Sequence, residues 1–296
     1  MVLMDRLTTN LQNSRTVDSL AAAQNRMARV QNQVSSGKAF ERASEDPSGA
    51  RMAMGLRSEQ MRIAQYSKNI DNGLLQLNAA RIHVDSVNSQ LLRARDLLVQ
   101  GQSSTSTPGV RTALASQIDV LKAGLLIDAN AQFGGRQLFG GATSATSAYS
   151  NVGVYTGDTN AVTTRVDADA TVRIELNGPE IFGASPADFY TVLTNIASHL
   201  RTNPVGDLAT DLTQLDALIE RAGDAQATVG TRINQLNSLK DVTADKDVEV
   251  TGALSRVEDT DLSKAIMELT LQQTGYEAAL RATASVMQVS LMDFLR

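Results

Sequence analysis

Seven apolar residues recur at every seventh position within one stretch of the chain, roughly residues 47–101. They are Leu56, Ile63, Ile70, Leu77, Val84, Leu91 and Leu98. A heptad pattern sustained over about six repeats predicts a long helix that packs in a coiled-coil-like bundle. At ~1.5 Å per residue this helix is ~80 Å long, so it needs partners of similar length. The rest of the sequence is therefore read for segments that can cover this stripe.

A second heptad series provides the main partner. Apolar residues step by seven from Leu208 to Leu236 and predict a helix over about residues 208–254. Shorter helices are predicted after Pro108-Gly109 and from Pro186 to about residue 201. We expect the core of the resulting bundle to hold Leu56, Ile63, Ile70, Leu77, Val84, Leu91, Leu98, Leu208, Leu215, Val229 and Leu236.

The sequence patterns near both ends of the chain predict amphipathic helices of similar length, over residues 7–34 and 262–295. Their remaining faces are rich in uncharged amides and poor in charge, and isolated helices of this kind are marginal in water. We therefore expect them to be largely disordered in a free monomer and to pack on other subunits. The predicted assembly interface consists of Leu7, Leu11, Leu20, Met27, Val30, Val34, Leu262, Ile266, Leu269, Tyr276, Leu280, Met287, Leu291 and Phe294.

The apolar period changes to two in the middle of the chain. Val172 and its neighbours alternate with polar residues, residues 162–166 can pair with them, and residues 152–154 predict a third strand. A glycine-bounded hairpin is expected at residues 133–141. We expect this β unit, at about residues 142–185, to sit on the bundle at the end of the rod far from the termini. The expected fold is mainly α, a long coiled-coil-like helical bundle with paired terminal helices and a small β-rich insertion.

Three domains follow from these segments. Residues 1–42 with 256–296 form a terminal-helix coiled-coil assembly domain. Residues 43–141 with 186–255 form a helical bundle rod domain, and residues 142–185 form a small β domain.

Composition excludes several classes of function. The 296-residue chain has no Cys, which removes disulfides, thiolate catalysis and Cys-based zinc sites. Its net charge of −5 gives no electrostatic footprint for nucleic acid, and no apolar run is long enough to span a membrane. The start of the chain meets charge too soon for a cleavable signal peptide. A cytoplasmic helical protein and secretion without signal cleavage both remain compatible.

No motif in the sequence predicts catalysis, a cofactor or a metal. His83 and His199 lie on different predicted helices, and Gly37-Lys38 lacks the other residues of a phosphate-binding loop. Glu258, Asp259 and Asp261 cluster like metal ligands, but their spacing is not that of a calcium loop and favours helix capping. The methionines are interpreted as core filler.

The segment of residues 35–50, SSGKAFERASEDPSGA, resembles the linker between the first two helices of flagellin-like proteins. Residues 138–141, 154–158, 257–261 and the ending Ser-Leu-Met-Asp-Phe-Leu-Arg are similar to other parts of that family. Phe40-Glu41 and Ala43 depart from the usual linker. The Glu45-Asp46-Pro47 form of the linker is closer to members at the hook–filament junction than to flagellin proper.

The resemblance implies a structural protein, not an enzyme, that joins the hook to the filament of the bacterial flagellum. Its implied partners are copies of itself, the first hook-associated protein, flagellin and an export chaperone at the C-terminal helix. It would be extracellular, exported by the flagellar type III pathway without a cleavable signal. A small flagellin is the alternative within the family. A cytoplasmic helical scaffold and an enzyme are alternatives from other classes, but no effector module or catalytic set is evident.

Overall fold

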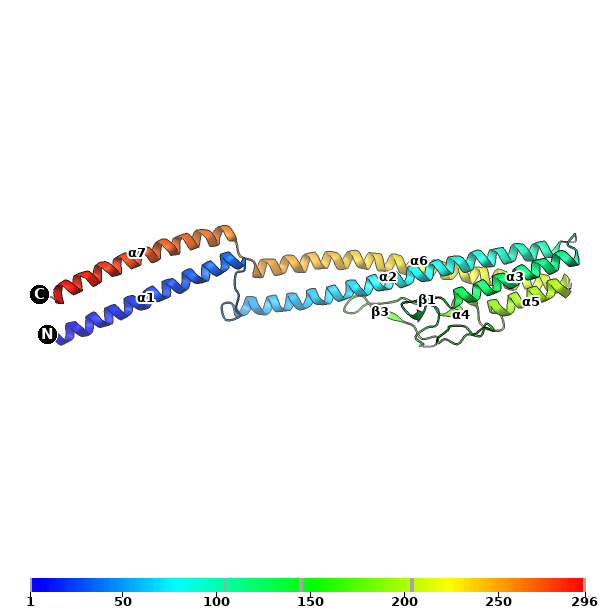
Figure 1. The fold of residues 1–296 in the computed structure, drawn as a ribbon, viewed down its shortest axis with the longest axis horizontal. Helices are drawn as coiled ribbons and strands as arrows, with labels where there is room; N and C mark the ends of the chain where they lie inside the picture. The colour runs from blue at the N-terminus through cyan, green and yellow to red at the C-terminus, as the bar shows by residue number, and fades with distance from the viewer. Residues whose placement is uncertain (1, 104, 144–145, 203–204, 295–296) are drawn as a thin grey trace. The chain divides into compact units, whose positions relative to one another are not determined.

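The computed structural model describes residues 2–103, 105–143, 146–202 and 205–294, with side chains described for residues 14–103, 105–143, 146–202 and 207–284. The predicted mainly α fold is confirmed. The elements in chain order are α1 (Val2–Ser36), α2 (Pro47–Gln102), α3 (Pro108–Ala129), β1 (Gln132–Phe133), β2 (Arg136–Gln137), β3 (Thr163–Arg165), β4 (Thr171–Arg173), α4 (Gly178–Phe182), α5 (Phe189–Thr202), α6 (Val205–Glu258) and α7 (Leu262–Phe294) (Figure 1).

The chain divides into two compact units. The first contains residues 1–61 and 248–296, and the second contains residues 62–247. By these limits α1 and α7 belong to the first unit. The helices α3 to α5 and all four strands belong to the second, and α2 and α6 contribute residues to both.

The second unit is built on the heptad stripes of α2 and α6. From Ile70 to Leu98 the α2 stripe is at most 1% exposed, and Leu208, Leu215, Val229 and Leu236 of α6 are fully buried. All of these side chains belong to one continuous apolar cluster. Burying a side chain of this size stabilises the fold by about 1.5–3 kcal/mol. This cluster is the main apolar core of the second unit.

Polar pairs at the edges of this cluster show the relative direction and register of α2 and α6. Within the second unit Arg95 Nε lies 2.7 Å from Asp216 Oδ1, Gln226 Nε2 lies 2.8 Å from Asp85 Oδ1, and Lys240 Nζ lies 2.7 Å from Asp71 Oδ1. The residue number on α6 falls by as much as the residue number on α2 rises from one pair to the next. The helices are therefore antiparallel and keep one register over this stretch. Exposed pairs of this kind add little stability, so the apolar stripes set the register.

The shorter helices complete the bundle. Thr107 Oγ1 accepts a hydrogen bond from the Val110 backbone N–H, and Pro108 occupies the first position of α3, where its missing N–H costs nothing. The helix α5 packs on α3 and buries its apolar face, including Val192 and Ile196. Both helices fall where the sequence predicted them.

The β segment is smaller than predicted, and it sits on the bundle as expected but not at the end of the rod. The strands β3 and β4 pair antiparallel with Thr164 opposite Val172, as expected, but residues 152–154 form no strand. That stretch holds only an isolated bridge between Tyr149 and Tyr155, because Val152 and Val154 point into solvent and have no neighbouring strand.

The β segment lies against the middle of α2 and the facing part of α6. Asn69 Nδ2 of α2 donates to the Arg165 carbonyl at 2.8 Å, and Lys246 Nζ of α6 lies 2.6 Å from Asp167 Oδ2. Its apolar residues, such as Val166 and Val172, join the same cluster as the helices. The expectation that it sits at the far end of the rod is wrong, because among the described residues of the second unit its β3–β4 hairpin contacts Asn69 and Lys246 and not the end of α2 near Gln102.

An aromatic group fixes the loops of this segment onto the bundle. Phe182 makes edge contacts with Phe139 and Tyr149, with ring centroids 5.5 and 5.4 Å apart, and Tyr149 contacts Phe189 at 5.7 Å. Tyr149 is 1% exposed, and burial raises the pKa of its hydroxyl. Aromatic pairs of this geometry add about 0.5–1.5 kcal/mol each beyond the area they bury. The unit thus has a second centre of packing beside the heptad core.

Candidate assembly surfaces

The first unit contains the two terminal helices, which pack side by side and antiparallel, so that α1 begins where α7 ends (Figure 1). On α1 the less exposed residues recur at spacings of four and three: Thr16, Leu20, Ala23, Met27, Val30 and Val34. On α7 they are Ala265, Leu269, Gln272, Tyr276, Ala279 and Thr283. These two series have the spacing of a coiled-coil seam. They are the faces on which the two helices meet.

The seam leaves much apolar surface of α7 uncovered. Leu262, Ile266 and Leu280 are 49%, 52% and 43% exposed. At ~100° per residue the three lie within about 40° of one another on the helix, so they form one ridge beside the seam. We call these residues the α7 ridge. A ridge of large apolar side chains on an isolated helix pair is a candidate contact for another chain.

The predicted interface residues divide between these two surfaces. Leu20, Met27, Val30 and Val34 of α1, with Leu269 and Tyr276 of α7, lie on the seam within the chain. Leu262, Ile266 and Leu280 lie on the exposed ridge. The side chains of Leu7, Leu11, Met287, Leu291 and Phe294 lie outside the described residues. The sequence pattern predicted one stripe on each helix, but it did not separate the face used within the chain from the face left open.

The predicted core residues are placed differently in the two units. Ile63 and the stripe from Ile70 to Leu98 are buried, as are the four α6 residues. Leu56 is the exception and is only half-buried. It lies in the first unit, where α2 lacks the cover that α3, α5 and the β segment provide in the second unit.

Two linkers meet next to this helix pair. The Ala39 backbone N–H donates to the Glu258 carbonyl at 2.7 Å, and the Thr260 N–H donates to the Gly37 carbonyl at 2.9 Å. These bonds form a short antiparallel bridge between the segment after α1 and the segment before α7. Gly37 has a φ of 70°, which glycine adopts without strain. The two linkers are therefore held together by their own backbones.

A buried carboxylate pairs with two cations where the two linkers meet. We call this place, residues 37–39 and 258–261 with Arg57, the joint. Glu258 is 6% exposed, and Arg57 Nη2 lies 2.8 Å from both of its carboxylate oxygens. Lys38 Nζ lies 3.4 Å from Glu258 Oε2. The sequence interpretation of Glu258 as a helix cap is wrong, because it ends α6, where the helix dipole disfavours an anion. That unfavourable position is the sequence signal for a cationic partner.

Capping holds for Asp261 and Asp46, whereas the predicted cap Asp259 accepts instead from the Ser255 hydroxyl of α6 at 2.6 Å. Asp261 Oδ1 accepts from the backbone N–H groups of Ser263 and Lys264 at the start of α7. Asp46 Oδ1 accepts from the Gly49 N–H at 2.9 Å and from Ser48, and these bonds lower the pKa of the Asp46 carboxyl. A side chain on Gly49 would collide with Asp46 and Phe40. The Asp46-Pro47 helix start predicted from the sequence is confirmed.

A pocket of about 450 Å³ opens beside this joint, within the first unit. Its floor includes the buried Ala50 and Ala53, and its rim carries charge from Lys38, Arg57 and Glu258. The rim charges are already paired with one another. The pocket can therefore receive an apolar side chain but presents no unpaired charge from those three residues.

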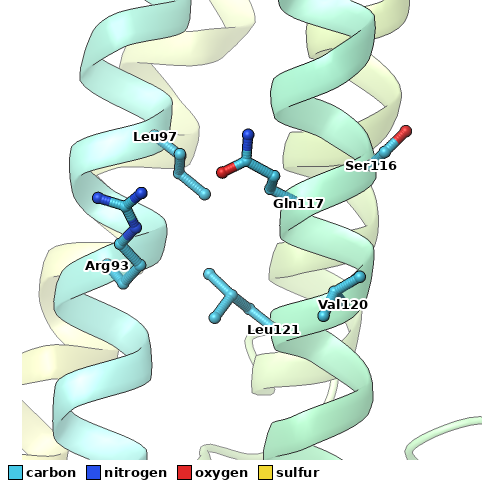
Figure 2. Close-up of a pocket in the computed structure, with 6 residues that line it drawn as sticks. All are labelled: Arg93, Leu97, Ser116, Gln117, Val120 and Leu121. Atoms are coloured by element: carbon cyan, nitrogen blue, oxygen red, sulfur yellow. The ribbon is translucent and has the colours of Figure 1, made fainter.

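A second hollow lies in the second unit, between α2 and α3, and has a volume of about 340 Å³. Leu97 of α2 and Leu121 of α3 point into the space between the helices, and Arg93 and Gln117 flank them (Figure 2). Val120 at its edge is 72% exposed. The hollow is an apolar groove on the helical face and offers no cluster of reactive groups.

The two histidines belong to structural networks. His83 Nδ1 lies 2.8 Å from Asp128 Oδ1, while Ser86 Oγ donates to Asp128 Oδ2 at 2.8 Å. In a hydrolytic triad the imidazole stands between the hydroxyl and the carboxylate. Here both groups bind the carboxylate, so Ser86 is not activated by His83. His199 pairs with the buried Asp211 at 2.7 Å and joins α5 to α6.

Other chemistry is limited in the part of the chain that the structure describes. No group of three or more His, Asp or Glu side chains there is placed to hold a metal ion. Among the described helices, none combines the length and the apolar character needed to cross a membrane. The features with a functional character are thus the α7 ridge, the joint and the groove.

These surfaces define a helical structural protein whose two ends pair and present apolar residues for assembly. The chain belongs to the bacterial flagellin family. The model of the bacterial flagellin N-terminal helical region matches residues 7–144, and the model of the C-terminal helical region matches residues 212–295. The resemblance found in the sequence is thereby confirmed.

Individual relatives agree with the family. Flagellar hook-associated protein 3 of Escherichia coli is 24% identical over 97% of this chain and 99% of its own length. Flagellin of Bacillus subtilis is 23% identical over 98% and 100%. The solved structure of the flagellar junction protein FlgL from Legionella pneumophila has a TM-score of 0.60 and 13% identity, covering 71% of this chain and all of that one. This last likeness concerns the fold alone.

Proposed function

We propose that the chain is an axial structural protein of the bacterial flagellum that joins the hook to the filament through its terminal helices. The observation that carries the proposal is the α1–α7 pair, which forms a seam within the chain and leaves the α7 ridge exposed. Similarity to hook-associated protein 3 over nearly the whole of both chains supports the position at the junction. The Glu45-Asp46-Pro47 linker supports the same position.

The α7 ridge would bury its side chains against neighbouring subunits around the flagellar axis. Full burial of each large apolar side chain is worth about 1.5–3 kcal/mol, which offsets the entropy lost on association only when several are buried together. The neighbours are other copies of this chain within the junction, the first hook-associated protein on the hook side and flagellin on the filament side. The bundle of the second unit supplies a body with a continuous apolar core.

The same proposal places the chain outside the cell, exported by the flagellar type III pathway without a cleaved signal. An export chaperone would cover the C-terminal helix before assembly, because its ridge is apolar and exposed. The proposed role involves no enzymatic activity, and the Ser86, His83 and Asp128 group does not have the order of a hydrolytic triad. Its work is mechanical connection.

Replacement of the α7 ridge tests the proposal. In a strain that lacks this protein, a variant with Leu262→Gln, Ile266→Gln and Leu280→Gln should fail to support filament growth. The matched control is Leu75→Gln, Ile82→Gln and Ile127→Gln, three residues of the second unit that are 58%, 64% and 74% exposed. The control should support normal filaments. Normal growth with the ridge variant, or with a chain truncated at residue 262, would refute the terminal-helix mechanism.

A small flagellin is the second candidate, and similarity to the Bacillus subtilis flagellin over the full chain favours it. The two candidates differ in what the purified chain builds. A flagellin should polymerise into long filaments on its own, whereas a junction protein should form only a short zone. Electron microscopy of flagella labelled with an antibody to this chain distinguishes a band at the base of the filament from labelling along its length.

A further inference from the structure

Methionine is segregated in this protein. All nine methionines lie in the first unit, and residues 62–247 contain none. They are Met1, Met4, Met27, Met52, Met54, Met61, Met267, Met287 and Met292. The large core of the second unit is filled without methionine, by leucine, isoleucine, valine and aromatic residues. A residue used as general core filler would not be distributed in this way.

Most of the methionines whose side chains are described face solvent. Met52 is 60% exposed, and Met54, Met61 and Met267 are each 68% exposed. Met27 lies on the α1–α7 seam. The interpretation of the methionines as core filler is therefore wrong for these four. Flexible, polarisable side chains on a surface suit contacts that must adapt to a partner.

Met54 and Met61 form a defined feature on α2. They are one heptad apart, so at ~100° per residue they lie within about 20° of each other on the helix. The buried Ile63 lies roughly opposite, about 160° from Met61 by the same spacing. Both side chains are exposed, although the buried Ala50 lies about 40° from Met54 by the same spacing and Met54 lines the pocket beside the joint. We call Met54 and Met61 the methionine ridge.

Charge beside the two ridges is complementary. Arg57 precedes Met61 by one turn but is already paired with Glu258, whereas the exposed Arg51 precedes Met54 by one turn. Arg51 Nε donates only to the Pro47 carbonyl of its own helix among its described hydrogen bonds. On α7 the exposed Glu277 lies one turn before Leu280 and on the same face as Ile266. Arg51 is therefore the arginine beside the methionine ridge that is not paired with Glu258, and Glu277, one turn before the exposed Arg281, places a carboxylate beside the α7 ridge.

We propose that the methionine ridge is a contact surface for the α7 ridge of a second copy of this chain, and that oxidation of its sulfur atoms switches this contact off. The inference rests on the proposed function and adds to it a named partner face and a chemical control. Because the two ridges are different surfaces, the contact is heterologous and can repeat from subunit to subunit. That is the type of contact that builds an open helical assembly.

The modification is oxygen transfer from a peroxide. One oxygen atom of hydrogen peroxide bonds to the thioether sulfur, the O–O bond breaks, and water leaves. The sulfur loses two electrons and becomes a sulfoxide, while the peroxide is reduced. The product is a polar side chain where the contact needs an apolar one. Methionine sulfoxide reductases reverse the step.

The location of the methionines makes the effect selective. The second unit contains no thioether, so peroxide at a concentration that oxidises methionine leaves its core unchanged. Oxidation should therefore stop assembly without unfolding the bundle. Oxidation of a core methionine would instead lower the stability of the fold.

The test starts from the purified full chain, with and without hydrogen peroxide. Mass spectrometry of peptides should show one added oxygen on Met54 and on Met61. Sedimentation should show self-association shifted to higher protein concentration by about tenfold, equivalent to about 1.4 kcal/mol at 25 °C. Thermal unfolding of the second unit should not move. Treatment with methionine sulfoxide reductases should restore the original self-association.

Three variants separate the ridge from other methionines. Met54→Leu/Met61→Leu keeps an apolar ridge that peroxide cannot oxidise, so it should self-associate normally and resist peroxide. Met54→Gln/Met61→Gln imitates the polar product and should self-associate poorly without peroxide. Leu75→Gln/Ile82→Gln is the matched control, because these residues are also one heptad apart and exposed on α2 but lie in the second unit. It should behave as the unmodified chain.

The outcomes distinguish the inference from the proposed function. Normal self-association of the glutamine variant, or peroxide sensitivity of the leucine variant equal to that of the unmodified chain, would overturn the inference while the junction role stands. An equal defect in the matched control would also overturn it. Failure of the untreated chain both to self-associate and to support filaments would overturn the proposed function and the inference together.

Discussion

The two units of this protein bury apolar side chains to different extents. In the second unit one continuous cluster joins α2, α3, α5, α6 and the β segment, and it includes fully buried Phe139, Phe182 and Phe189. In the described part of the first unit the buried hydrophobic residues are Val30, Ala50, Ala53 and Ala265. Leu262, Ile266, Met267 and Leu271 remain exposed there. The described residues of the second unit thus share one large apolar core, whereas those of the first unit bury few apolar side chains within the chain.

Polar interactions show the same difference. In the second unit the edges of the helices carry ion pairs and two histidine–aspartate networks that join separate elements. No ion pair among the described residues joins α1 to α7. The ion pairs of the first unit centre on Glu258 at the joint. Among the described residues, the α1–α7 pair is thus held mainly by its apolar seam.

Hydrogen exchange on the purified monomer should show the largest contrast between the units. Amides in the core stretches of α2 and α6 should approach the global stability, about 5–15 kcal/mol for a typical domain, whereas those of α1 and α7 should open at almost no cost. Isolated helices with one narrow seam are marginal in water. Strong protection over residues 7–34 and 262–295 in the monomer would contradict the view that assembly completes the first unit.

A buried charge should unfold the second unit. Leu77 is fully buried, so Leu77→Asp places an unpaired carboxylate in the core and should cost about 4–5 kcal/mol or more. Ile82→Asp is the matched control on the same helix, since Ile82 is 64% exposed and its replacement should change stability by about 0.5 kcal/mol or less. Thermal unfolding followed by circular dichroism measures both. Equal melting temperatures for the two variants would show that the stripe is not the core.

Much of the second unit could be predicted because its helices follow simple periods. The heptad series identified the buried residues from Ile70 to Leu98 and from Leu208 to Leu236, and the period of two identified the pairing of β3 with β4. The prediction of a third strand at residues 152–154 was wrong for a physical reason. Val152 and Val154 alternate with other residues, but no edge of a sheet lies beside them, and alternation alone does not supply a partner.

The surfaces of the first unit were harder to predict. The spacing of apolar residues in the sequence identifies an apolar face of a helix. It does not tell whether that face packs within the same chain or against another one. Leu269 and Leu280 belong to the same predicted stripe, yet Leu269 lies on the seam and Leu280 on the exposed ridge. Leu56 belongs to the core heptad but lacks cover, because the number of neighbouring elements is set by tertiary structure. The pairing of Arg57 with Glu258, 201 residues away, carries no local signal beyond the position of Glu258 at a helix end.

The joint offers a smaller test of the first unit. Arg57→Ala leaves the buried Glu258 with only the more distant Lys38 and should destabilise the joint by about 1–3 kcal/mol, the cost of an under-satisfied buried group. Lys38→Ala removes the longer contact and should cost less, about 0–1 kcal/mol. Hydrogen exchange at Ala39 and Thr260, whose amides form the linker bridge, measures both changes. A larger loss of stability from Lys38→Ala than from Arg57→Ala would show that Lys38, and not Arg57, is the main partner of Glu258.

The smallest expected effect is a pH dependence at the start of α2. The Gly49 backbone N–H, and then Ser48, hold the pKa of Asp46 below its usual value of about 3.9. A carboxyl that is more acidic in the folded state adds stability above its unfolded pKa and loses it as pH falls through the folded value. The cap should therefore persist at neutral pH and weaken only below about pH 4.

Nuclear magnetic resonance of the Gly49 amide measures this transition. Its shift should titrate with a midpoint below that of an ordinary aspartate. Asp46→Asn should remove the titration and keep the cap, because asparagine is as good a capping residue. Asp46→Ala should lose the cap at every pH. A Gly49 midpoint at or above the usual aspartate value would mean that the amide does not stabilise the charged form. The start of α2 would then depend on Pro47 and the linker contacts instead of on this cap.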